Sequence, residues 1–116
     1  MKIEIDRNFW FVDILKSSLG YKDENFVFEK KVGDALIDLL IIDNECLDIY
    51  PLALIEFRAL YKEMDPSVAQ VKKYQSLMER PDLPAFLVHG NEVYVLQSYG
   101  WQKIDIDYFP RYERLK

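Results

Sequence analysis

Three charged residues stand inside segments of the chain that are otherwise apolar. Asp38 lies within the apolar run 35–42, and Glu56 and Arg58 lie within the apolar run 52–60. An unpaired carboxylate is costly to bury, so a buried acid is usually paired with a cation or bound to a metal ion. These three residues are therefore the first candidates for chemistry.

A hairpin formed by these two runs would bring the three residues together. Asp38 and Glu56 each lie nine residues from a loop centre at Leu47, so they would face each other across the strands. Arg58 would share the face of Glu56. Carboxylates about 5 Å apart repel unless a cation lies between them, and either a divalent metal ion or the guanidinium of Arg58 meets this need. Oxygen ligands without His or Cys favour Mg²⁺ or Mn²⁺ over zinc.

A helix predicted over residues 67–80 adds a second group of candidates. Gln70 and Tyr74 are four residues apart and share a helix face, and Lys73 lies beside them. This helix follows the Glu56 strand directly, so its first turns can lie near the carboxylates. The ordinary alternative makes Tyr74 a residue at the edge of the core and Gln70 a solvated one.

The elements that must position these residues follow the order αβββαββ. Apolar spacing predicts a first helix over 8–19, with Asn8 as its N-cap. Strands are predicted over 25–32, 35–42, 52–60, 85–89 and 92–96. A helix between the third and fourth strands predicts a crossover, so part of the sheet should be parallel and covered on both faces. Residues 98–116 are expected to be a short strand or an irregular cover.

The order and spacing of these segments resemble those of the PD-(D/E)xK nuclease superfamily. The resemblance rests on residues 33–41, on 52–59, on Gln70-x-x-x-Tyr74 and on the hairpin at 84–94, and it covers roughly residues 9–97. The branch it resembles is the nuclease domain at the amino end of type I restriction enzyme R subunits. It implies a single α/β domain over 1–116 with a restriction-endonuclease-like fold, in which helices flank a mixed central sheet of about five strands.

The resemblance also implies an activity, that of a Mg²⁺-dependent endodeoxyribonuclease. In this family pattern, Asp38 and Glu56 would hold Mg²⁺ or Mn²⁺, and Asp13 of the first helix is a further candidate ligand. Gln70, Tyr74 and Lys72 would contact the nucleic acid or order the site.

Arg58 stands where the family has a catalytic lysine. Arginine is always charged and presents a fork of donors, so it can stabilise charge on a phosphate. It can equally pair with Asp38 and Glu56, which would leave an inactive domain that binds nucleic acid or a partner protein. Lys73, and after it Lys62, are the alternative positions for the lysine.

Composition limits the partners that this chain can have. Twenty Asp and Glu against fifteen Lys and Arg give a net charge of −5, which disfavours tight non-specific DNA binding by an isolated monomer. We therefore expect DNA binding to involve a homodimer or a partner restriction or modification subunit.

Other features indicate the compartment and leave a third function class open. A single cysteine, Cys46, and the lack of an apolar run of about 20 residues predict a cytoplasmic protein without membrane contact. His89, beside the hairpin turn Gly90–Asn91, is expected to be structural or exposed. The third class is an assembly module that oligomerises through the aromatic first helix and the tail.

Overall fold

The computed structural model describes residues 9–45, 50–59 and 62–116, without the side chain of Phe9. The predicted N-cap Asn8, the hairpin centre Leu47 and Cys46 lie outside the described residues. The elements are α2 (Phe9–Ser18), η1 (Asp23–Asn25), β1 (Phe26–Val32), β2 (Ala35–Ile42), β3 (Pro51–Arg58), α3 (Asp65–Leu77), β4 (Ala85–His89), β5 (Glu92–Gln97), β6 (Gly100–Ile104), η2 (Ile106–Tyr108) and α4 (Tyr112–Leu115).

The strands form one mixed sheet in sequence order, β1-β2-β3-β4-β5-β6. All neighbours are antiparallel except β3 and β4, which are parallel because the chain crosses over through α3 between them. The predicted crossover is therefore confirmed. The sheet has six strands rather than about five, because the aromatic segment after Gln97 turns back and adds β6.

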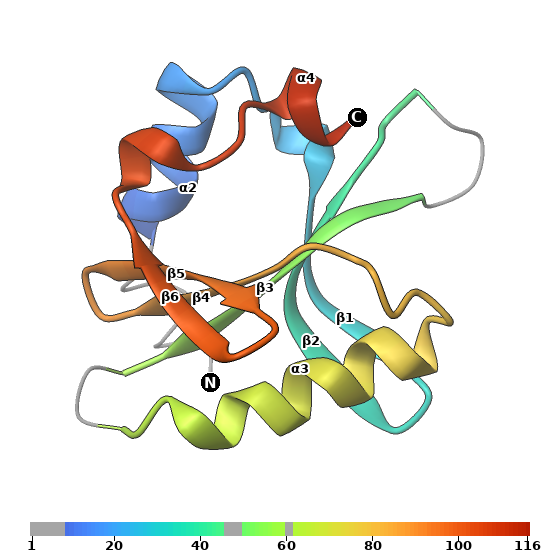
Figure 1. Ribbon diagram of the computed structural model, residues 1–116. Coiled ribbons are helices and arrows are strands. Elements are labelled where there is room, and N and C mark those ends of the chain that lie inside the picture. Colours follow the sequence, from blue (N-terminus) through green and yellow to red (C-terminus); the bar gives the residue numbers. More distant parts are fainter. Residues whose placement is uncertain (1–8, 46–49, 60–61) are drawn as a thin grey trace.

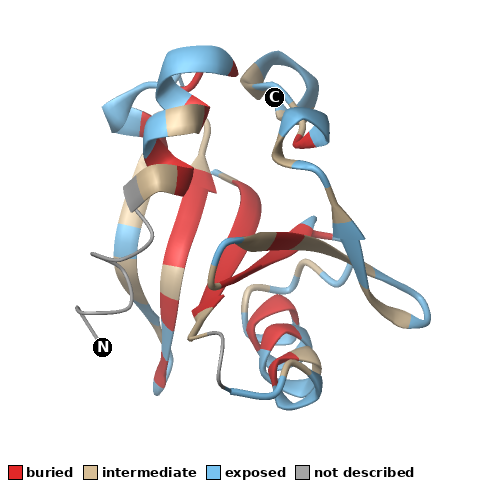
Figure 2. Cartoon of the chain, turned by 90° about the vertical axis from the view of Figure 1, so that its left-hand side faces the viewer, coloured by how far each residue is buried: buried red, intermediate tan, exposed pale blue. Residues whose placement is uncertain are grey.

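Helices cover both faces of the sheet, with α2 and α4 on one face and α3 on the other (Figure 1). On the α2 face, Phe11 and Leu15 pack on Ile55 and Phe57 of β3. On the α3 face, Val71 and Tyr74 pack on strand residues that include Leu54. The central strands are accordingly the most buried part of the chain (Figure 2). No helix among the described residues is long and apolar enough to cross a membrane.

The C-terminal segment belongs to the core and is more than an irregular cover. Phe109 is 2% exposed and packs edge-on against Phe11, with ring centroids 5.3 Å apart. Its ring also lies tilted against that of Phe86, with centroids 4.4 Å apart. The hydroxyl of Tyr21 donates a hydrogen bond of 2.8 Å to the carbonyl of Pro110. The core therefore extends beyond the predicted limit at residue 97.

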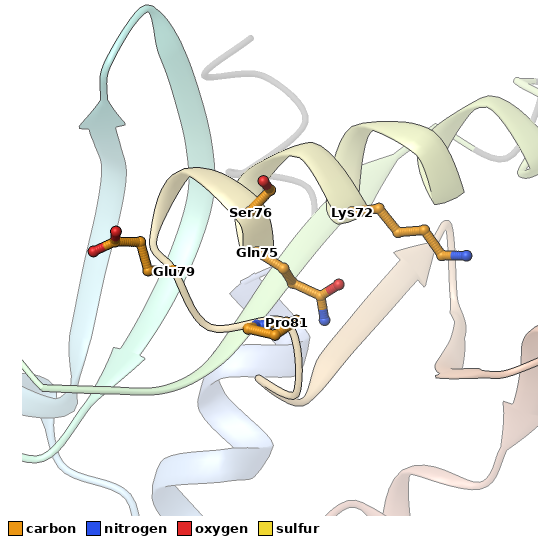
Figure 3. Close-up of a pocket in the computed structure, with 5 residues that line it drawn as sticks. All are labelled: Lys72, Gln75, Ser76, Glu79 and Pro81. Carbon is orange, nitrogen blue, oxygen red and sulfur yellow. The ribbon is translucent and has the colours of Figure 1, made fainter.

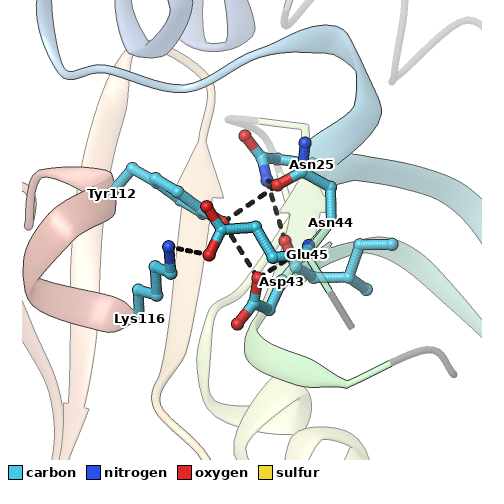
Figure 4. Close-up of polar contacts among 7 residues, drawn as sticks. Asn25, Asp43, Asn44, Glu45, Tyr112 and Lys116 are labelled. Atoms are coloured by element: carbon cyan, nitrogen blue, oxygen red, sulfur yellow. Dashed lines mark hydrogen bonds and ion pairs between the residues drawn. The ribbon is translucent and has the colours of Figure 1, made fainter. Parts of the chain in front are cut away.

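Polar contacts fasten α4 to the end of β2 (Figure 4). The hydroxyl of Tyr112 lies 3.1 Å from Asn44 Oδ1 and 3.3 Å from Asp43 Oδ1. Lys116 pairs with Glu45, and Asn25 donates to the Ile42 carbonyl at 2.9 Å. These contacts hold the last helix beside the β2–β3 connection, on the side of the sheet away from α3.

The same packing bears on the assembly-module hypothesis. Phe11 is fully buried in the α2-face core, and Trp10 is partly buried against it. Phe11 is therefore enclosed within the domain, whereas Trp10 is only partly buried and the tail rings Tyr99 and Tyr108 are exposed, so the assembly-module hypothesis stays a prediction.

Candidate functional site

The candidate site begins at an irregularity in β2. Ile37 packs on the α3 face, whereas Leu39, two residues later, packs on the α2 face. Regular alternation would keep both on one face, so the strand twists at Asp38. In the facing strand β1, Glu29 has a φ of +52°, and the ladder pairs Phe28 with Leu39 and Lys30 with Ile37 on either side of this point. A left-handed backbone at a non-glycine residue costs roughly 1–2 kcal/mol, so other contacts must stabilise this twist.

At this twist, the Asp38 side chain is hydrogen-bonded to the backbone of β3. Its Oδ2 accepts a hydrogen bond of 2.9 Å from the backbone N–H of Phe57. The β2–β3 ladder runs from Ile42 to the pair Leu39 with Ile55, so Phe57 N–H lies beyond the last ladder pair and takes the carboxylate as its acceptor. This bond fixes the Asp38 carboxylate against the backbone beside Glu56.

Glu56 lies one residue beyond the last pair of the β2–β3 ladder. Continuing the observed register by one step beyond Leu39 and Ile55 pairs Asp38 with Glu56. Ile55 and Phe57 face α2, so Glu56 faces α3, and it is only 5% exposed. A carboxyl group buried on the sheet face under a helix is the most unusual polar feature of this strand.

Tyr74 of α3 lies over the two carboxylates. Its hydroxyl donates a hydrogen bond of 3.0 Å to the Leu36 carbonyl and accepts one from the side-chain amide of Gln70. Burial raises the pKa of Tyr74 to about 12, and the negative charges of Glu56 and then Asp38 act in the same direction, against the Gln70 hydrogen bond. The structure thus brings together four of the predicted site residues, namely Asp38, Glu56, Gln70 and Tyr74.

Arg58 lies on the same face as Glu56 but does not bridge the carboxylates. Within the described part of the chain it forms no ion pair with Asp38 or Glu56, and its Nε is buried without a hydrogen-bond partner. The ion-pair triad considered from the sequence is therefore not formed.

The two helix lysines lie elsewhere. Lys73 is exposed, and its ammonium lies 4.0 Å from Asp34 in the β1–β2 turn. Lys72 is exposed and lines a pocket of about 430 Å³ with Gln75, Ser76, Glu79 and Pro81 (Figure 3). Among the contacts of the described residues, neither lysine reaches Asp38 or Glu56.

Asp13, the further candidate ligand, is also not brought to the carboxylates. It is exposed on α2 and lines a pocket with Lys16, Asp23 and two phenylalanines of β1. The helix that carries it packs on the opposite face of the sheet from the one that Glu56 faces.

His89, which the sequence predicts to be structural or exposed, is buried at the carboxyl end of β4. It is 8% exposed, pairs in register with Arg58 across the parallel strands β3 and β4, and its Nε2 lies 2.7 Å from the Lys62 carbonyl oxygen. On the next strand, Glu92 accepts hydrogen bonds from Tyr94 and Lys103, which lower its pKa. The predicted crossover could have placed His89 beside Arg58, because it makes the third and fourth strands parallel and aligns their carboxyl ends.

β6 is hydrogen-bonded to α3, the helix that carries Gln70 and Tyr74. The indole N–H of Trp101 donates a hydrogen bond of 2.9 Å to Ser67 Oγ, and Ser67 is fully buried in the first turns of α3. The bond joins the last strand to the helix that carries Gln70 and Tyr74, so the tail helps to hold α3 in place.

Comparison with known proteins gives one distant structural likeness. Neither the protein-family models nor the curated proteins contain a match to this sequence. A chain in the cryo-electron microscopy structure of a DrdV–DNA complex is similar to it, with 11% sequence identity and a TM-score of 0.45. The match covers 90% of this chain and 9% of that chain, so this chain spans less than a tenth of that protein's length.

Proposed function

We propose that this chain is a Mg²⁺-dependent endodeoxyribonuclease of the PD-(D/E)xK superfamily, with a restriction-endonuclease-like fold. The observation that carries the proposal is the opposition of Asp38 and Glu56 on adjacent strands, on the face covered by α3. Gln70 and Tyr74 lie over the same carboxylates, in the spacing of the type I restriction R-subunit branch that the sequence resembles.

The donor chemistry of the pair fits a hard divalent cation. Asp38 and Glu56 offer carboxylate oxygens, which are the ligands that Mg²⁺ and Mn²⁺ prefer. The described residues contain no group of three His, Cys, Asp or Glu side chains able to hold a metal ion. Mg²⁺ is commonly held by one or two carboxylates, with water and substrate phosphates completing its shell. Asp38 and Glu56 would therefore hold such an ion together with a bound phosphate.

The surrounding residues have separate roles in this proposal. A bound cation would supply Lewis-acid polarisation of the phosphate and a water of lowered pKa. Tyr74, whose phenol is protonated at neutral pH, orders the site by holding Gln70 and the β2 backbone. Arg58 donates to the phosphate and so stabilises negative charge there. Lys73 and Lys72 lie outside this group of residues.

DNA binding by this chain would depend on a partner. The net charge of −5 opposes non-specific binding to a polyanion, and the two site carboxylates account for only part of it. We expect a homodimer or a restriction or modification subunit to take part in that binding.

Cleavage of supercoiled plasmid DNA in Mg²⁺ tests the proposal. We expect nicking by the wild-type protein and its loss in Asp38→Asn and in Glu56→Gln, because each substitution removes a charged ligand but keeps the side-chain shape. Glu113→Gln changes an exposed acid of α4 by the same chemistry and should cleave as the wild type does. Cleavage that survives both site substitutions would overturn the assignment.

A second candidate is an inactive domain of the same fold that binds nucleic acid or a partner protein. The observation that favours it is Arg58 at the position of the family's lysine. A wild-type protein that binds DNA without cleaving it, together with an Arg58→Lys variant that does cleave, would establish this second candidate. An Arg58→Lys variant that cleaves no better than an active wild type would exclude it.

A further inference from the structure

Two buried nitrogen atoms lie at the carboxyl ends of β3 and β4, and neither has a hydrogen-bond partner in the described part of the chain. They are Arg58 Nε and His89 Nδ1. Arg58 and His89 are register partners on the parallel strands, and the N–H of Gly90 donates 3.1 Å to the Arg58 carbonyl, which keeps the strand ends aligned. Phe57 and Val88 both belong to the α2-face core, so the residues that follow them project toward the α3 face.

The hydrogen bond at the other ring nitrogen fixes the state of the imidazole. His89 Nε2 lies 2.7 Å from the Lys62 carbonyl oxygen, which can only accept, so Nε2 carries a hydrogen. Nδ1 is therefore an acceptor when the ring is neutral and a donor when the ring is charged. Arg58 Nε is a donor in either case, because arginine does not lose its proton in proteins.

We propose that Arg58 and His89 together bind a phosphodiester group, with the His89 ring protonated in the bound state. Buried polar atoms normally have partners, so this pair of nitrogens indicates a place for a ligand or an ordered water. The non-bridging oxygens of a phosphodiester only accept, and they need two donors, Arg58 Nε–H and His89 Nδ1–H. The inference rests on the proposed function, because it names the groups that would hold the substrate phosphate beside Glu56.

Proton balance gives this site a characteristic pH dependence. The free protein with a neutral ring takes up one proton from solvent on binding the diester, so affinity is highest when the ring is already charged and falls as the ring loses its proton. Among the described residues, the titratable and charged groups on this side of the sheet are Asp38, Glu56, Arg58, Lys62, Tyr74, Glu92, Tyr94 and Lys103.

The chain has one histidine, so the ring nitrogens can be followed by ¹⁵N NMR without ambiguity. The first probe is thymidylyl-thymidine, which has a single phosphodiester and no terminal phosphate, added in EDTA and again in Mg²⁺. We expect Nδ1 to shift toward its imidazolium value on saturation at pH 7.5. Inorganic phosphate, the second probe, can carry its own proton and should bind without the same shift. A ring that stays neutral at saturating dinucleotide in both conditions would overturn the inference.

Two substitutions of His89 separate ligand binding from a structural role. His89→Gln places an amide near the Nε2 position, where it can still donate to the Lys62 carbonyl, but it removes Nδ1. We expect it to weaken dinucleotide binding about tenfold and to abolish the pH dependence, as expected for the loss of one charge-assisted hydrogen bond. His89→Asn keeps a polar atom near Nδ1 and loses the Lys62 contact. Weaker binding in His89→Asn alone, with His89→Gln binding like the wild type, would make the role structural and contradict the inference.

The outcomes also distinguish this site from the nuclease proposal. Ring protonation by the dinucleotide in a protein that never cuts plasmid would support the phosphate site and contradict the nuclease function. Plasmid cleavage that needs Asp38 and Glu56, but is unchanged in rate and pH profile by His89→Gln, would support the nuclease and contradict the phosphate site. Arg58→Lys, which keeps the charge and removes Nε, should weaken dinucleotide binding to a similar extent.

Discussion

The two faces of the sheet differ in what they bury. On the α2 face the packed side chains are almost all apolar, and rings of Phe11, Phe86 and Phe109 meet there from three distant parts of the chain. The α3 face instead contains buried Glu56 and His89, and Ser67 and Gln75 of the helix itself are buried as well. One face is therefore built for stability, while the other combines a smaller apolar core with polar groups that stability alone would not favour.

The largest stability effect should come from the α2 face. Phe109→Ala removes a fully enclosed ring from the aromatic cluster, and we expect the free energy of unfolding to fall by about 3–5 kcal/mol in urea denaturation. Tyr108→Ala is the matched control, because that neighbouring ring is 81% exposed and its loss should change stability by less than about 0.5 kcal/mol. Similar losses for both variants would mean that the tail is not part of the core.

An intermediate effect should come from Tyr74 on the α3 face at alkaline pH. Its pKa is raised to about 12 from an ordinary value near 10, so the folded state holds the phenol proton more tightly than the unfolded state does. The part of the free energy of unfolding that comes from this raised pKa is therefore fully present below pH 10. It is lost as the pH rises toward 12, by an amount on the order of 3 kcal/mol.

Denaturation at pH 9 and at pH 11.5 measures this contribution when wild type is compared with Tyr74→Phe, which cannot ionise. The variant should lose less stability than the wild type over the interval. Tyr21, Tyr94 and Tyr112, whose pKa values are also raised by burial, supply the loss that remains in both proteins. Equal losses in the two proteins would show that burial and the neighbouring carboxylates do not raise the pKa of Tyr74.

The smallest effect should come from the outer surface of α3. Lys73 and Asp34 are largely exposed and 4.0 Å apart, a geometry that contributes about 0.5 kcal/mol or less. A double-mutant cycle with Lys73→Met and Asp34→Asn should therefore give a coupling energy within that limit, and salt should remove it. If Lys73→Met abolished plasmid cleavage, Lys73 would instead be the displaced catalytic lysine.

Much of the framework could be predicted from the sequence, because it depends on local pattern. The apolar run containing Asp38, the hairpin pairing and the crossover helix follow from periodicity, and the structure has the β2–β3 register that a loop centre at Leu47 predicts. The short strand expected in the tail is present as β6, but the core role of Phe109 was missed, because the tail has mixed composition and its burial depends on tertiary contacts with distant residues such as Phe11.

The site was predicted less completely than the framework, for a physical reason. The face of the sheet on which the Asp38 side chain lies depends on the twist at Asp38 and on the left-handed backbone of Glu29 in the neighbouring strand. Regular side-chain alternation predicts neither of these features. The separation of Arg58 from the carboxylates and the burial of His89 likewise depend on how two parallel strands end side by side.

The central claim is that Asp38 and Glu56 together bind a divalent cation on the α3 face. A crystal soaked in Mn²⁺, with data collected at the manganese absorption edge, tests it directly. We expect one anomalous peak within bonding distance of a carboxylate oxygen of both residues, and no such peak in Glu56→Gln. Crystals of the wild-type protein with an ordered site and no manganese between these two carboxylates would contradict it.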